Sequence, residues 1–227
     1  MASRSPGVPY IAPFVIFLAL IGMNRLWPMA ALTDEILRLA VMLAVLLLAA
    51  RPLLRFRAQD FRVQSWGVSV LVGAAIFVLW IGPDLLFPQY RSLFLFNNSV
   101  VGTARSSLTE AARHDVPVLF LRTLRAVAIV PIVEELFWRG WLLRWVIHND
   151  FEKVPLGAYT ALSFWTVALL FASEHGPYWD VGLVAGIIFN WWMIRTKSLG
   201  DLILAHAVAN ACLSGYVIAA GKWEYWL

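Results

Sequence analysis

The feature that most constrains this chain is a series of long stretches without a charged residue. Four of them, at 5–24, 63–83, 154–173 and 202–221, are each about twenty residues long. A helix of that length crosses the roughly 30 Å hydrocarbon core of a bilayer. Only 14% of the residues are charged, against about 25% in an ordinary soluble domain. The pattern therefore predicts an all-α, polytopic membrane protein.

Three further segments complete the expected set of spans. Shorter uncharged runs at 39–50 and 181–194 can be extended by flanking residues whose charged ends reach the interface. A segment at 117–147 is apolar but carries too many charges for a passive anchor, so it should face protein or water. We expect about seven spans, between six and eight, in one membrane domain over 1–227. The charges in that segment are Arg122, Arg125, Glu134, Glu135, Arg139 and Arg144.

The sequence also allows predictions for the first uncharged run and for the longest connection. No small-residue cleavage site follows the run that begins at Ser5, so it is interpreted as a retained helix rather than a signal peptide. The longest connection, 84–116, is expected to hold an interfacial helix, because Leu93, Phe94 and Phe96 are apolar among polar neighbours.

The basic residues are interpreted as topology signals. The net charge is +4, but the cations lie mainly between apolar spans, so no nucleic-acid partner is expected. Four arginines in one short loop place that loop, and with it the N-terminus, on the cytoplasmic side by the positive-inside rule. The single Cys212 excludes an intrachain disulfide. The four arginines are Arg51, Arg55, Arg57 and Arg62.

Two adjacent carboxylates inside an apolar segment form the first motif with chemical content. Each costs at least about 2.5 kcal/mol at the centre of a membrane helix, so a partner must compensate it. Glu135 and Arg139 are four residues apart and should form a buried ion pair. Glu134 is rotated by about 100° and faces another neighbour. The alternative is that both carboxylates are structural and paired with arginines such as Arg125.

Two further motifs lie in later spans. Phe171 and His175 share a helix face at the end of the fifth span, with Glu174 between them in sequence. His206 and Asn210 project from one otherwise apolar face of the last span. Each motif alone is also typical of structural contacts, since polar side chains bridge membrane helices.

Taken together, the motifs favour hydrolysis by activated water. A buried carboxylate held by a histidine can act as general base, and a histidine with an asparagine amide can donate to an oxyanion. Metal is the rival: Glu134, His175 and His206 could bind zinc with water as fourth ligand. We favour no metal or other cofactor, because no H-E-x-x-H motif is present and asparagine is an unusual ligand. A non-proteolytic scaffold or immunity-type partner stays as the second hypothesis, while a transporter finds little support.

The order Glu-Glu-x-x-x-Arg, Phe-x-x-x-His and His-x-x-x-Asn on successive membrane helices resembles the family of CAAX proteases and bacteriocin-processing enzymes. The resemblance covers about 118–215, the motif-bearing half of the chain. The residues of these motifs and the closing sequence Gly-Lys-Trp-Glu-Tyr-Trp are similar to those of a bacterial subgroup called CAAX prenyl protease-related. Members of this subgroup accompany exosortase systems. This implies an active site inside the helix bundle, a bacterial inner-membrane location and a membrane-associated peptide or protein substrate.

The resemblance also implies roles for individual residues. Glu134 would activate water with His175, while His206 and Asn210 would form the oxyanion hole. Glu135, Arg139 and Phe171 would be supporting residues.

Two further points concern the residue before His175 and the positions of the two histidines across the membrane. Glu174, directly before the histidine, departs from the family pattern and could orient the imidazole of His175. His175 and His206 begin near opposite membrane faces. They can meet only if the fifth span is long and tilted, or if the Gly176-Pro177 turn dips into the membrane.

Overall fold

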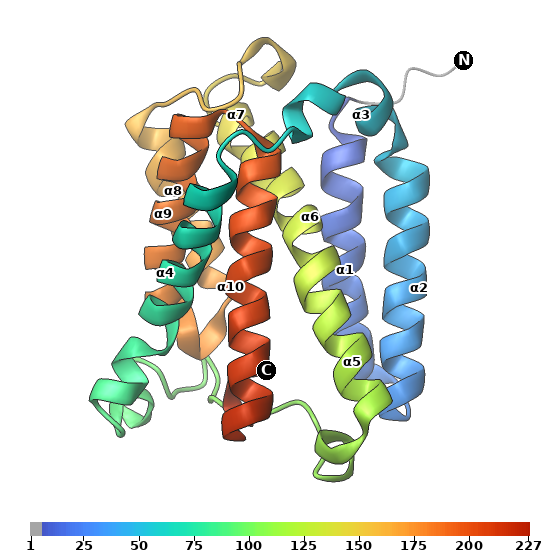
Figure 1. Cartoon of the computed structure of the whole chain (residues 1–227), viewed down its shortest axis with the longest axis vertical. Coiled ribbons are helices and arrows are strands. Elements are labelled where there is room, and N and C mark those ends of the chain that lie inside the picture. Colours follow the sequence, from blue (N-terminus) through green and yellow to red (C-terminus); the bar gives the residue numbers. More distant parts are fainter. Residues whose placement is uncertain (1–5) are drawn as a thin grey trace.

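The computed structural model describes residues 6–227, apart from the side chains at 24–25 and 54–56. The start of the first run at Ser5 lies outside the described residues. Seven helical rods form one bundle (Figure 1), and the described residues contain no strand, so the all-α prediction is confirmed. The rods are α1 (Val8–Leu26), α2 (Ala31–Ala49), α4 (Trp66–Leu86), a continuous helix over Val116–Trp145, α8 (Ala161–Ser173), α9 (Trp179–Thr196) and α10 (Leu199–Ala220).

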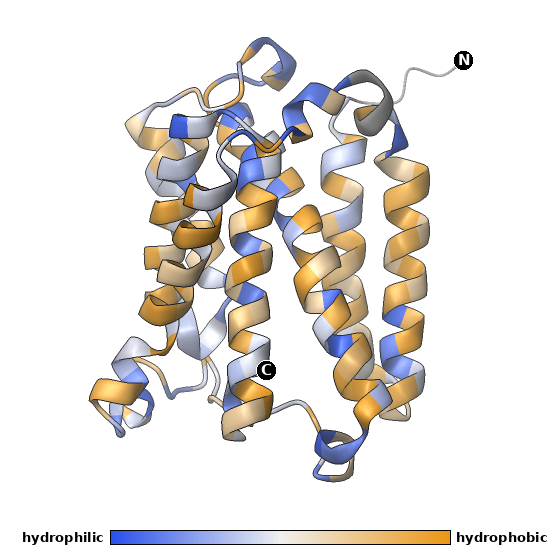
Figure 2. Cartoon of the chain, viewed as in Figure 1, coloured by the Kyte–Doolittle hydropathy of each residue, from blue (hydrophilic) through white to orange (hydrophobic). Residues whose placement is uncertain are grey.

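The exterior of the bundle fits a lipid environment. Figure 2 shows hydrophobic residues along the middle of the helices and hydrophilic residues mainly at the connecting ends. Leu47, Leu71 and Phe120 leave more than 60% of their surface exposed. Three helices are long and apolar enough to cross a membrane by length and composition alone, namely α4, Val116–Trp145 and α10.

The helix over Val116–Trp145 is interrupted by two π-helical turns. It consists of α5 (Val116–Leu124), the π-helical turn η4 (Arg125–Ile129), α6 (Val130–Glu135), the π-helical turn η5 (Leu136–Leu142) and α7 (Leu143–Trp145). Pro131 has no N–H and crowds the carbonyl four residues earlier, so regular α-helical bonding cannot continue through this point. The turn η4 lies directly before it. Glu134 and Glu135 therefore sit in a short α-helical stretch between two widened turns.

Helices α4 and α10 run parallel and in close contact. Their N-terminal ends are joined by the Asp201 carboxylate, which accepts hydrogen bonds from Gln64 N (2.8 Å), Ser65 N (2.9 Å) and Ser69 Oγ (2.7 Å). Further along, Gly73 allows a close approach, because a Cβ there would overlap the carbonyl oxygen of Ala205. This contact fixes the height of α10, and with it the position of its polar side chains.

Helix α8 is too short to cross the hydrocarbon core. Its 13 residues span roughly 20 Å at 1.5 Å per residue. The 3-10 turn η7 (Gly176–Tyr178) follows, and Gly176 packs so closely under the preceding loop that a Cβ would lie 3.0 Å from Val101 O. Protein therefore covers this turn, as a dip into the membrane would require, and the dip itself stays a prediction. His175 and His206 line the same cavity without a long, tilted fifth span.

The connection after α4 differs from the prediction. Its helical elements among the described residues are two 3-10 turns, η2 (Tyr90–Ser92) and η3 (Ala111–His114). The prediction of an interfacial helix in this connection is therefore wrong. Arg91 holds the segment instead, donating to Asp84 (2.9 Å) and to Pro177 O (2.8 Å). These bonds hold the connection as a loop against the turn η7.

Candidate active site

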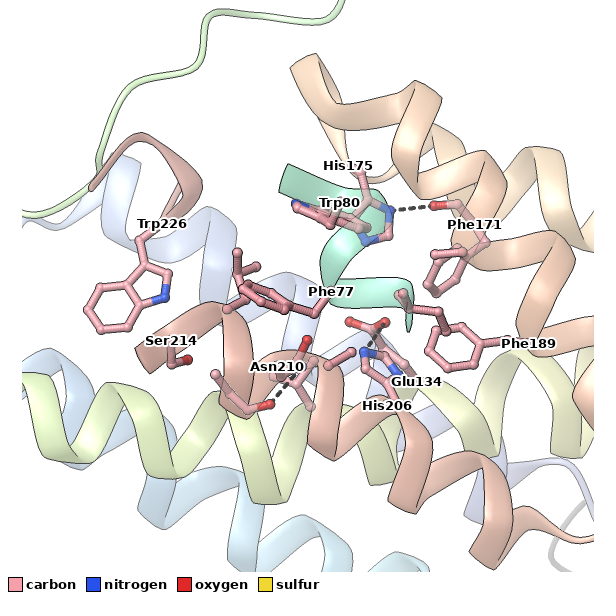
Figure 3. Close-up of a pocket in the computed structure, with 16 residues that line it drawn as sticks. Phe77, Trp80, Glu134, Phe171, His175, Phe189, His206, Asn210, Ser214 and Trp226 are labelled. Carbon is pink, nitrogen blue, oxygen red and sulfur yellow. Dashed lines mark hydrogen bonds and ion pairs between the residues drawn. The ribbon is translucent and has the colours of Figure 1, made fainter. Parts of the chain in front are cut away.

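All four residues predicted to carry the chemistry line one cavity inside the bundle (Figure 3). Its volume is about 200 Å³. Helices α4, α8, α9 and α10, the helix over Val116–Trp145 and the segment after α10 form its wall. The lining residues are Ile76, Phe77, Trp80, Ala126, Val130, Glu134, Phe171, His175, Ala185, Phe189, His206, Ala209, Asn210, Leu213, Ser214 and Trp226.

Glu134 directs its carboxylate into this cavity. The side chain is buried, and its Oε2 has no hydrogen-bond partner within the described part of the chain. The His206 ring is the nearest charge partner, with Nε2 at 4.0 Å from Oε2. A buried carboxylate oxygen without a partner is costly, and here it is free to bind a water or a substrate atom.

Glu135 is fully buried, and both of its carboxylate oxygens accept hydrogen bonds. Arg139 Nη1 donates to its Oε1 (3.1 Å) and its Oε2 (3.2 Å), so the predicted ion pair is confirmed. His206 Nδ1 lies 2.9 Å from the same Oε1. The two adjacent carboxylates thus have different surroundings, because only one of them is tied to neighbouring helices.

Arg139 is held by residues from two other helices. Its Nε donates to Asn190 Oδ1 (2.9 Å), and its guanidinium lies over the rings of Phe171 (4.6 Å) and Phe189 (5.2 Å). Asn190 in turn donates to Phe164 O (2.8 Å). Sequence reasoning missed Asn190, although a single asparagine in the uncharged run 181–194 was an available signal.

The hydrogen bond to Glu135 fixes the orientation of the His206 ring. Since a carboxylate only accepts, Nδ1 carries a proton and Nε2 faces Glu134. Two carboxylates, Glu134 and Glu135, face one guanidinium, Arg139, so an imidazole protonated on both nitrogens would bring the cluster to zero net charge. In that state Nε2–H is a donor aimed into the cavity.

His175 is oriented by the backbone of its own helix. Its Nδ1 lies 2.7 Å from Phe171 O, and since a carbonyl only accepts, Nδ1 is the protonated nitrogen. In the neutral ring Nε2 is then a free acceptor. The ring packs edge-on against Trp80, with centroids 5.1 Å apart. Figure 3 shows the ring on the opposite side of the cavity from Glu134.

Glu174 has a different partner from the one expected. Its Oε1 accepts a hydrogen bond from Trp138 Nε1 (3.1 Å), whereas the imidazole of His175 is held by Phe171 O. The idea that Glu174 orients His175 is therefore wrong. The carboxylate instead ties the end of α8 to the helix that carries Glu134.

Asn210 uses part of its amide to join two helices. Its Nδ2 donates to the carbonyl of Ala126 (2.8 Å), which belongs to the π-helical turn η4. An amide nitrogen has two N–H groups, so a second donor is still available to a ligand. Asn210 thus combines the expected helix contact with a place in the cavity wall.

The polar residues of the cavity do not form a metal site as arranged. No group of three or more His, Cys, Asp or Glu side chains in the described part of the chain is placed to hold an ion. Glu134 Oε2 and His206 Nε2 are 4.0 Å apart, which is wide for two donors that each lie about 2.0–2.2 Å from one zinc ion.

The mouth of the cavity is bordered by the segment that follows α10. Trp226 is buried, and its carbonyl accepts from Ser107 N (2.9 Å). Tyr225 donates its phenol proton to Asp84 Oδ2 (2.7 Å). Burial, with the Asp84 carboxylate second, raises the pKa of Tyr225, so the phenol stays neutral and keeps this bond.

Comparison with known proteins agrees with the motifs. Residues 116–212 match the family model described as type II CAAX prenyl endopeptidase Rce1-like. The matched segment contains Glu134, His175, His206 and Asn210. Comparisons with curated proteins and with solved structures gave no match. The family match supports the resemblance to CAAX proteases and, at that general level, an intramembrane endopeptidase.

Proposed function

We propose that this protein is an intramembrane endopeptidase in which Glu134 and His175 activate water against a peptide bond. The observation that carries the proposal is the unpartnered Oε2 of Glu134, in a cavity that three separate sequence motifs share. Leaving a buried carboxylate oxygen unsatisfied lowers stability, which is typical of a site kept open for a ligand.

The proposed reaction moves one proton at a time. Water bound between Glu134 and His175 gives a proton to this pair as its oxygen attacks the carbonyl carbon of the substrate. The oxyanion that forms accepts hydrogen bonds from His206 Nε2–H and from the second N–H of Asn210. The carbon–nitrogen bond then breaks, and the stored proton passes to the leaving amine.

Glu135, Arg139 and Asn190 act by positioning. Glu135 holds Nδ1 of His206 and so keeps Nε2 turned toward the cavity, while Arg139 balances the Glu135 charge. Asn190 fixes the guanidinium from a third helix. We propose that the reaction uses neither a metal ion nor another cofactor.

The alternative is a non-proteolytic scaffold or immunity-type partner that uses the same residues as helix contacts. The bonds from Asn210 to Ala126 O and from His206 to Glu135 fit that function as well. It does not explain the free oxygen of Glu134 or the shared cavity, so the peptidase is favoured.

The proposed location is the bacterial cytoplasmic membrane with the N-terminus in the cytoplasm. The arginine-rich loop after α2 supports this orientation. The residue identities within the motifs support membership of the exosortase-associated subgroup. The expected partners are the lipid bilayer and a membrane-associated peptide or protein, with no nucleic acid.

The test is cleavage of a peptide library by purified protein in nanodiscs. Replacing Glu134 by Gln should reduce cleavage by at least roughly 10²-fold, the range for loss of a general base. Glu152→Gln, the same change at an exposed glutamate, should leave the rate unaltered. Cleavage by the Glu134→Gln protein at the wild-type rate would refute the assignment.

A further inference from the structure

We infer that the cavity opens toward the non-cytoplasmic side of the membrane and takes a peptide through one large apolar side chain. This inference rests on the proposed function and adds the side of entry and the substrate class. It draws on the direction of the cavity, the distribution of exposed cations and the size of the space.

The cavity runs toward the C-terminal ends of α4 and α10. Both helices begin at the same end of the bundle, since Asp201 binds Gln64 N and Ser65 N. The α10 residues in the wall start at His206 and continue to Ser214. Trp80 and Trp226 complete the wall beyond the middle of the bundle. Glu134 and His206 thus lie at the inner end, His175 packs beside Trp80 nearer the far end, and the mouth lies at that far end.

Exposed cations are concentrated at the opposite end from the mouth. Among the described side chains, four exposed cations there make no ion pair, whereas Arg105 is the one such residue on the mouth side. Other mouth-side cations are neutralised, as in Arg113 with Glu110 (2.8 Å) and Lys222 with Glu224 (3.6 Å). Unpaired cations favour the cytoplasmic leaflet, with its anionic lipids. The four are Arg51, Arg62, Arg195 and Lys197.

The cavity is small and aromatic. Its volume of about 200 Å³ is slightly larger than an engineered cavity of about 150 Å³ that binds benzene. Phe77, Trp80 and Phe189 offer ring surfaces to one bulky side chain.

Trp226 is the residue that limits access at the mouth. Its indole lies under the guanidinium of Arg122, 5.3 Å from the ring centroid, and its backbone is held by Ser107. A side chain entering from this end must pass the indole. Trp226 therefore acts as a specificity-determining residue, and its removal should widen the range of accepted side chains.

The side of entry can be tested by cysteine labelling in cells. In a Cys212→Ala background, Lys222→Cys and Lys197→Cys place single thiols at exposed positions on the two ends. A membrane-impermeant maleimide added to intact spheroplasts should label the first protein, and the second only after permeabilisation. The reverse pattern would overturn the inference.

The substrate class can be tested with oriented proteoliposomes. Peptides that differ only in Phe or Ser next to the cleaved bond should differ by roughly 10-fold or more in kcat/KM, as for an apolar pocket. Trp226→Ala should reduce this preference, while Trp66→Ala, at an exposed indole on the other end, should not.

The outcomes separate the two proposals. Cleavage only of peptide on the cytoplasmic face, or equal cleavage of the Phe and Ser peptides, overturns this inference and keeps the peptidase. Absence of cleavage from both faces refutes the proposed function, and the substrate class fails with it. The labelling result then still decides which end of the bundle faces the cytoplasm.

Discussion

The two adjacent glutamates offer a matched pair of variants that should differ in their effect on stability. Glu135→Gln removes the charge that balances Arg139, a guanidinium with no exposed surface. Glu134→Gln makes the same chemical change one residue earlier, at a carboxylate whose Oε2 has no partner in the described structure. We expect the first variant to lose stability as well as activity, because Glu135 also holds His206, and the second to lose activity alone.

The magnitude follows from the contacts of Arg139. Removing one partner of a buried ion pair costs about 3–5 kcal/mol. The lower end applies here, because Asn190 Oδ1 and two aromatic rings still contact the guanidinium. For a chain of this size, about 3 kcal/mol corresponds to a fall in Tm of roughly 6–12 °C. Glu134→Gln should leave Tm unchanged or higher, since it removes a buried charge beside another of the same sign.

The assay is thermal unfolding of the purified variants in one detergent, followed in parallel with peptide cleavage. The double variant Glu135→Gln with Arg139→Gln should recover part of the lost Tm, because no uncompensated charge remains. Equal midpoints for the two single variants would refute the division of labour between Glu134 and Glu135. So would a double variant less stable than the sum of its single changes.

Two further predictions concern the frame of the site and its chemistry. Gly73→Ala should destabilise the protein by about 1–3 kcal/mol, the usual cost of overpacking, because the added methyl group would overlap Ala205 O. Gly82→Ala is the control in the same helix, since a Cβ there would meet no atom within 4 Å. It should leave the thermal unfolding midpoint unchanged. Treatment with EDTA and 1,10-phenanthroline should leave peptide cleavage unaltered, since the polar residues do not form a metal site as arranged; a loss restored by added zinc would contradict the water-only mechanism.

Local spacing predicted the parts of the site that depend on one helix. Glu135 and Arg139 are one helical turn apart, and they pair even though a π-helical turn begins between them. His206 and Asn210 lie on one face of α10 and both reach the cavity. Their predicted catalytic roles remain untested predictions.

Contacts between helices could not be predicted in this way. Asn190 is one polar residue in an apolar run, and only the packing of α9 against the Val116–Trp145 helix shows that it holds Arg139. The depth of His175 depends on where α8 ends, and the uncharged run 154–173 is longer than the helix inside it. Trp226 reaches the cavity through a turn after α10, a path that hydropathy does not indicate.

The shortness of α8 also has a consequence for the surrounding bilayer. A wall of roughly 20 Å beside neighbours such as the 22-residue α10 leaves a local hydrophobic mismatch, and lipids adjust to a short wall by thinning. Water and headgroups would then come closer to the midplane on this flank than elsewhere around the protein. A scissile bond near the membrane surface would need to travel only a short distance from the aqueous phase to reach Glu134.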